Sequence, residues 1–99
     1  MLGGAGMARP LNGREKAVVQ AEKSKVETYL GTTFTVYDPV LIKIQVVNGE
    51  NFVVKILVDN EEYIHVKMNV PFEYTGKEDS PEPASLIYVH TGKTFDDKL

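Results

Sequence analysis

The chain of 99 residues contains no cysteine, which excludes disulfide bonds, thiolate metal sites and a cysteine nucleophile. Because small secreted domains usually need disulfides for stability, this absence favours a reducing compartment. The starting sequence MLGGAGMARP lacks the apolar segment of a secretory signal, and no apolar run approaches the ~18 residues of a membrane span. We therefore expect a cytoplasmic protein that does not enter a membrane.

Positive charge is also scarce, since 11 Lys and Arg residues stand against 14 Asp and Glu residues, for a net charge of -3. Without a basic cluster, nucleic acid is not an expected partner. The sequence has no P-loop, no dinucleotide-binding glycine motif and no Ser-His-Asp order. His65 and His90 lack metal-ligand spacing. We therefore predict that the protein is not an enzyme and has no catalytic residues, no metal site and no cofactor.

The apolar pattern first has the period of a helix. Residues 1–11 contain three glycines and a proline, which predicts a flexible N-terminal arm. Asn12 and Glu15 have the spacing of a capping box, so a helix is expected over residues 13–30. The residues expected to form the apolar stripe of this helix are Val18, Val19, Val26, Tyr29 and Leu30.

From Thr33 onward the apolar side chains recur at every second position, which is the period of a β-strand. A first long strand should be bent or bulged at residues 38–39, because proline cannot donate to the ladder. Three further strands are expected around residues 52–58, 64–68 and 86–90. A helix followed by a strand meander predicts an α+β fold, with one N-terminal α-helix packed on a four- to five-stranded antiparallel β-sheet. We assign residues 12–99 to a single domain.

The stretch QVVNG raises a separate question, because two valines lead directly into an Asn-Gly pair that predicts a tight two-residue turn. Val46 and Val47 point to opposite faces of the strand, so at least one of them should be exposed. An apolar tip on a tight turn suits insertion into a cleft, and Gly49 would let a foreign backbone come close. The alternative interpretation is a plain type I′ hairpin with β-branched flanks.

These features together resemble the stefins, the single-domain, disulfide-free branch of the cystatins. The stretch QVVNG matches the Gln-x-Val-x-Gly signature of that family. The strand segments NFVVKI and YIHVK, the ending DDKL and the glycine-bearing start also resemble stefin segments. The resemblance covers nearly the whole chain and implies the cystatin fold.

The resemblance implies a reversible, tight-binding inhibitor of papain-like, cathepsin-type cysteine proteases. Stefins block the active-site cleft with a wedge made of an N-terminal arm and two hairpin loops. Carried over by position, the protease-binding residues are Gly3 and Gly4 in the arm, Gln45, Val46, Val47, Asn48 and Gly49 in the first loop, and Pro71 and Phe72 in the second loop. Tyr74 is a further candidate.

The second loop departs from the stefin pattern, because Pro71-Phe72 stands where stefins usually have Leu-Pro and the connection extends through Pro83. This departure leaves open an alternative function, a protein-interaction domain that keeps the cystatin fold without inhibiting proteases. We expect a monomer, although edge strands and the first hairpin would also allow a domain-swapped dimer.

Overall fold

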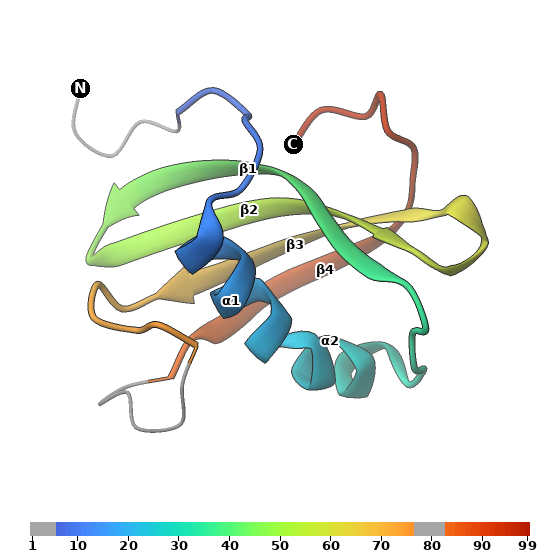
Figure 1. Cartoon of the computed structure of the whole chain (residues 1–99), viewed down its shortest axis with the longest axis horizontal. Coiled ribbons are helices and arrows are strands. Elements are labelled where there is room, and N and C mark those ends of the chain that lie inside the picture. The colour runs from blue at the N-terminus through green and yellow to red at the C-terminus, as the bar shows by residue number, and fades with distance from the viewer. Residues whose placement is uncertain (1–5, 77–82) are drawn as a thin grey trace.

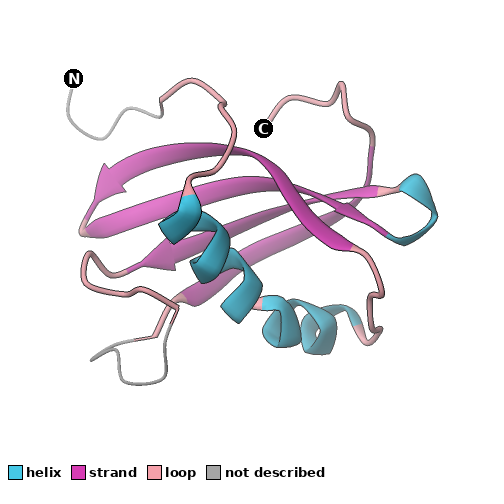
Figure 2. Cartoon of the chain, in the orientation of Figure 1, coloured by secondary structure: helices cyan, strands magenta, loops and turns pink. Residues whose placement is uncertain are grey.

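A four-stranded antiparallel sheet with two helical segments across one face makes up the fold (Figures 1 and 2). The computed structural model describes residues 6–76 and 83–99. Each strand pairs with its neighbour in the sequence, in the order β1-β2-β3-β4. The elements are α1 (Gly13–Ala21), α2 (Lys23–Leu30), β1 (Tyr37–Val47), β2 (Gly49–Val58), the 3₁₀ turn η1 (Asp59–Glu61), β3 (Tyr63–Val70) and β4 (Ser85–Lys93). The predicted α+β architecture is confirmed.

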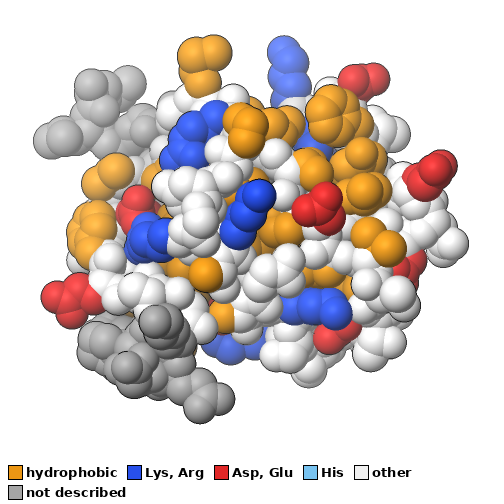
Figure 3. Space-filling model, viewed as in Figure 1, with side chains coloured by type: hydrophobic (Ala, Val, Ile, Leu, Met, Phe, Trp, Pro, Cys, Tyr) orange, Lys and Arg blue, Asp and Glu red, His pale blue; other side chains and the backbone are white. Residues whose placement is uncertain are grey.

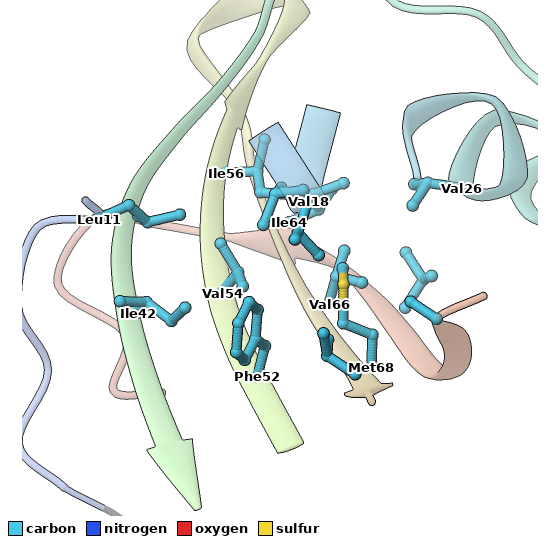
Figure 4. Close-up of a cluster of buried hydrophobic side chains, with 14 of the residues drawn as sticks. Leu11, Val18, Val26, Ile42, Phe52, Val54, Ile56, Ile64, Val66 and Met68 are labelled. Carbon is cyan, nitrogen blue, oxygen red and sulfur yellow. The ribbon is translucent and has the colours of Figure 1, made fainter. Parts of the chain in front are cut away.

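The hydrophobic core lies between the helices and the inner face of the sheet (Figure 4). Strands β2 and β3 contribute side chains from even-numbered positions, as the alternation of a strand requires, whereas Tyr37 of β1 and Val89 of β4 are odd-numbered core residues. Tyr29, which the helical pattern placed in the apolar stripe, is instead 63% exposed. The main core residues are Val18, Val19 and Val26 from the helices and Ile42, Phe52, Val54, Ile56, Ile64, Val66 and Met68 from the strands.

The helix predicted over residues 13–30 is interrupted at Glu22. Its amide donates to the carbonyl of Val19, three residues back, at 3.2 Å, which tightens this turn relative to an α-helix. The Glu22 carboxylate points inward, where it accepts a hydrogen bond from the Tyr74 hydroxyl at 3.3 Å. The interruption turns α2 away from the direction of α1, so that both segments lie against a twisted sheet (Figure 1).

The bend predicted in the first strand is present as a β-bulge. The pairing of β1 with β2 shifts register between Pro39 and Leu41, so Val40 is the extra residue. Proline explains the position, because it has no amide hydrogen to offer to the ladder. After the bulge the even positions return to the inner face, where Ile42 is fully buried.

The residues that precede α1 pair with the outer edge of β1. The amide of Gly6 donates to the carbonyl of Ile44 at 3.0 Å. Arg9 and Ile42 exchange two backbone hydrogen bonds of 3.0 and 2.8 Å. This pairing satisfies backbone groups that an edge strand would otherwise expose. The boundary between an arm at 1–11 and the domain stays a prediction.

The capping box predicted at Asn12 and Glu15 is present and has an additional partner. The Glu15 amide donates to Asn12 Oδ1, and the Asn12 amide donates to Glu15 Oε1, both at 2.9 Å. Arg9 donates to both carboxylate oxygens of Glu15, at 2.8 and 2.7 Å. These bonds, with that from Arg9 the largest cause, hold the pKa of Glu15 below its ordinary value. The described residues before α1, from Gly6 onward, are thus bonded to both β1 and α1.

The outer face of the sheet is partly covered by the C-terminal segment. Lys55 Nζ donates to the carbonyls of Phe95 and Asp97, and it lies 5.1 Å from the centre of the Phe95 ring. His65 lies on this outer face, as the alternation predicted, and is only 4% exposed. Its Nε2 has no hydrogen-bond partner among the described residues. Burial, followed by the positive charge of Lys55, lowers the pKa of His65.

We predict that acidification through the range of histidine titration destabilises the protein. The unfolded chain takes up a proton at His65 near the ordinary pKa of 6.5, whereas the folded chain does so only at lower pH. The unfolded state therefore binds more protons in this window, so the free energy of unfolding falls as the pH drops below about 7. Urea unfolding followed between about pH 7.5 and pH 6 measures this slope where carboxylates remain almost fully ionised.

His65→Gln should flatten that slope. An unchanged slope in the His65 variant would contradict the assignment.

Candidate functional site

The β1–β2 turn and the loop after β3 lie side by side at one end of the molecule (Figure 1). The last pair of the β2–β3 ladder at this end joins Glu50 to Val70. Asn69 Nδ2 donates to Asn51 Oδ1 at 3.0 Å and to the Asn48 carbonyl at 3.4 Å. The tip of the first hairpin is therefore held against β3 by polar contacts as well as by the ladder.

The geometry of the β1–β2 turn differs from the predicted two-residue type I′ turn. Val47 pairs with Gly49 and Val46 pairs with Glu50, so Asn48 stands alone at the tip. A type I′ turn requires a positive φ at both central residues. Gly49 has a φ of 90°, but Asn48 is not among the described residues with a positive φ. The Asn-Gly signal located the turn correctly and gave the wrong pairing register.

Gly49 is buried because the chain's own backbone passes beside it. A Cβ built at this position would lie 2.7 Å from the carbonyl oxygen of Val70 and 3.5 Å from the Cα of Pro71. Contacts of 2.7 Å to backbone are not tolerated, so only glycine allows the two loops to approach this closely. The sequence suggested that Gly49 admits a foreign backbone, and in the structure the neighbouring backbone is that of residues 70–71.

Apolar side chains remain exposed on this end of the molecule. Val46 and Val47 are 52% and 39% exposed, which confirms that at least one of them had to face solvent. Phe72 is 60% exposed and Pro71 is half-buried. Figure 3 shows hydrophobic side chains along the left edge, over the turn and the loop. We call these residues, Val46, Val47, Pro71 and Phe72, the apolar edge.

The remaining predicted site residues have different positions. Asn48 is exposed at the tip of the turn, and Gln45 is half-buried in β1. Gly3 and Gly4 lie outside the described residues. Tyr74 is buried, with 7% exposed, and is therefore an internal anchor of the second loop rather than part of its outer surface.

Arg14 is a residue of this region that the sequence analysis missed. Its Nη1 donates to Glu50 Oε1 at 3.0 Å, next to the first turn. Its Nη2 donates to the carbonyls of Phe72 and Tyr74, at 3.3 and 3.2 Å. The only signal in the sequence was a cation in the first turn of a helix, where the helix dipole favours acidic side chains.

The inner end of the second loop is packed against the helices. The Tyr74 hydroxyl donates to the buried carboxylate of Glu22, and burial, followed by the charge of Glu22, raises the pKa of Tyr74. A Cβ at Gly76 would lie 2.7 Å from the carbonyl oxygen of Ala17. The described part of the loop, 71–76, is therefore held close to α1 over most of its length.

The described part of the chain has neither a metal-binding group of side chains nor a membrane-spanning helix. Within 6–76 and 83–99, no three His, Asp or Glu residues are grouped so as to hold a metal ion. The helices of that same part of the chain are too short and too polar to cross a membrane. The apolar edge is the most prominent feature of this end of the molecule.

Comparisons with known proteins identify the family. No protein-family model matches the chain. Cystatin-A2 of Dictyostelium discoideum is 31% identical over 98 residues, covering 99% of this chain and 94% of that protein. Cystatin-A1 of Sus scrofa is 31% identical over 99 residues, covering all of this chain and 91% of that protein. Leukocyte cysteine proteinase inhibitor 1 of Sus scrofa is 24% identical over 99 residues, again with 91% of that protein covered.

The helices packed on a four-stranded antiparallel meander, with an apolar edge at one end, define the class of cystatin-fold proteins. Similarity over nearly the full length of cystatins A and B shows that the chain belongs to the stefin family. The resemblance found in the sequence is therefore confirmed. Cystatins are inhibitors rather than enzymes, in agreement with the prediction that this chain is not an enzyme.

We predict that Gly49→Ala destabilises the protein more than Gly92→Ala. Both glycines have a positive φ, of 90° and 69°, so both substitutions incur the left-handed penalty of about 1–2 kcal/mol. A Cβ at Gly92 meets nothing within 4 Å, whereas one at Gly49 collides with backbone and should add about 1–3 kcal/mol. The free energy of unfolding in urea measures both; equal losses would mean that the two loops do not need their close approach.

Proposed function

We propose that this protein is a reversible, tight-binding inhibitor of papain-like, cathepsin-type cysteine proteases. The observation that carries the proposal is the apolar edge, in which two exposed valines and an exposed phenylalanine project from a rigid framework. Family membership also supports protease inhibition, because one relative is named a cysteine proteinase inhibitor. Exposed apolar groups gathered at one end of a small domain are typical of a protein-binding surface.

The apolar edge would act as a wedge in the active-site cleft. Val46, Val47 and Phe72 would lose their contact with water, and the exposed backbone of the turn would form hydrogen bonds with the protease. Because the turn and the loop are already held by Arg14 and Asn69, little conformational entropy is lost on docking. The tip would lie over the catalytic thiol without offering an accessible peptide carbonyl, so the inhibitor would not be cleaved.

The N-terminal arm would supply the third part of the wedge. Gly6 bonds to Ile44, two residues before Val46 on the same strand. Gly6 is the first described residue, and Gly3 and Gly4 lie outside the described part of the chain. We further propose that the protein acts as a monomer in the cytoplasm, where a domain without disulfides is at no disadvantage.

A titration of papain tests the proposed function. Inhibition of the hydrolysis of a fluorogenic peptide should be reversible and near-stoichiometric. Gly49→Glu should abolish it, because the new side chain would force apart Gly49 and Val70 and place a charge at the apolar edge. Gly92→Glu, which introduces the same residue at a positive φ in open space, should inhibit like the wild type.

Absence of inhibition of papain and of a panel of lysosomal cysteine proteases would contradict the proposal. It would favour the alternative of a non-inhibitory interaction domain, for which the second loop, with its Pro71-Phe72 sequence, would be the first surface to examine.

Deleting Met1–Gly4 should weaken inhibition chiefly through faster dissociation. Most differences in affinity between variants of one interface arise in the off-rate. Stopped-flow association and displacement experiments separate the two rates. A slower association with an unchanged off-rate would argue that the arm guides the encounter instead.

A further inference from the structure

The described part of the second loop, residues 71–76, has no ladder partner. The pairing with β2 ends at Glu50 and Val70, and β3 ends there too. Within residues 71–74 the backbone is stabilised by one turn bond, from the Tyr74 amide to the Pro71 carbonyl at 3.0 Å. The direction in which the exposed Phe72 side chain points therefore depends on contacts from outside the loop.

One guanidinium group from α1 supplies those contacts and also contacts the first hairpin. Arg14 uses one nitrogen for two loop carbonyls and the other for the carboxylate of Glu50. The guanidinium carbon lies 5.9 Å from the centre of the buried Phe52 ring. The planar, forked geometry of arginine fixes the directions of its hydrogen bonds, which a lysine cannot do. The guanidinium group of Arg14 therefore fixes the position of the second loop relative to the first hairpin.

Helix stability does not explain a cation at this position. Arg14 is the second residue of α1, where the positive end of the helix dipole disfavours positive charge. The pair with Glu50 is partly solvated, since the two side chains are 34% and 18% exposed. Partly exposed ion pairs contribute little to folding. The main effect of Arg14 is therefore to fix where the two loops lie, rather than to stabilise the helix or the fold.

We propose that Arg14 is a positioning residue for protease inhibition: it holds Phe72 of the second loop in register with Val46 and Val47 of the first. This inference rests on the proposed function. A bound protease would meet one preformed apolar edge, and no ordering of the second loop would oppose binding. Arg14 would act through the position of Phe72.

The test compares Arg14→Gln with Lys16→Gln. Lys16 is an exposed cation on the same helix, so both variants remove one positive charge from the start of α1. Arg14→Gln should raise the inhibition constant for papain about tenfold, mainly through a faster off-rate. Backbone amide exchange over residues 71–76 should be faster in the free Arg14 variant than in the Lys16 variant. The melting temperatures of both should stay within about 4 °C of the wild type.

Two further variants separate positioning from simple charge loss. Arg14→Lys keeps the charge but not the fork, so it should restore only part of the affinity. Phe72→Ala should weaken inhibition in the wild type and should weaken it less in the Arg14→Gln background, because the two residues act together.

The outcomes distinguish this inference from the proposed function. A wild-type protein that inhibits no cysteine protease overturns both. Inhibition by the wild type, with equal off-rates in Arg14→Gln and Lys16→Gln, overturns only the role of Arg14. Full recovery in Arg14→Lys, or strictly additive effects with Phe72→Ala, also overturns it, because charge alone would then suffice.

Discussion

The structure depends on a difference in length between its two layers. Fully extended, the eleven residues of β1 would cover about 33 Å, whereas the seventeen residues of α1 and α2 would cover about 26 Å even if they were placed end to end. The helices bury the middle of the sheet, where Phe52, Val54 and Val66 are fully inaccessible. The end of the first hairpin extends beyond this cover. Val46 continues the alternating pattern of the core beyond this cover and is 52% exposed, and Val47, on the opposite face, is 39% exposed, so the two valines contribute to the apolar edge.

An end that projects from the core needs other means of support, and here most of them are polar. Glycine at position 49 allows the backbone of residues 70–71 to lie directly beside the first turn. Asn69 bonds across the hairpin, Arg14 bonds to both loops, and Glu22 holds Tyr74 at the interruption between α1 and α2. Such contacts give rigidity without hiding apolar side chains from a partner. A rigid and exposed apolar edge is what tight binding by a small domain requires.

The other surfaces of the sheet are protected in different ways. Gly6 and Arg9 cover the outer edge of β1, which reduces the risk of pairing with another chain. The C-terminal segment covers part of the outer face through the carbonyl contacts of Lys55. A lysine that is only 3% exposed is satisfied here by backbone oxygens, not by a carboxylate. The side chains of the apolar edge therefore remain exposed to solvent, whereas the outer edge of β1 and part of the outer face are covered by other segments of the chain.

Local sequence was sufficient for the elements whose cause is local. The capping box of Asn12 and Glu15 follows from capping chemistry, and the bulge after Pro39 follows from the missing amide of proline. The even-numbered core positions of β2 and β3 follow from strand alternation. The motif QVVNG and its neighbours also indicated the family. The exposure of the valines followed from their position beyond the helix.

Tertiary contacts decided the rest, because they join residues that are distant in the chain. Glu22 is a good helix former, and only the inward position of its carboxylate accounts for its burial at the break between α1 and α2. The register of the first turn depends on Val70, twenty-one residues after Gly49. The sequence placed Tyr74 among the candidate protease-binding residues, whereas in the structure its side chain is buried and its hydroxyl donates to Glu22. No sequence motif indicated Arg14, because its hydrogen bonds join α1 to Glu50 and to the second loop, which are far from it in the sequence.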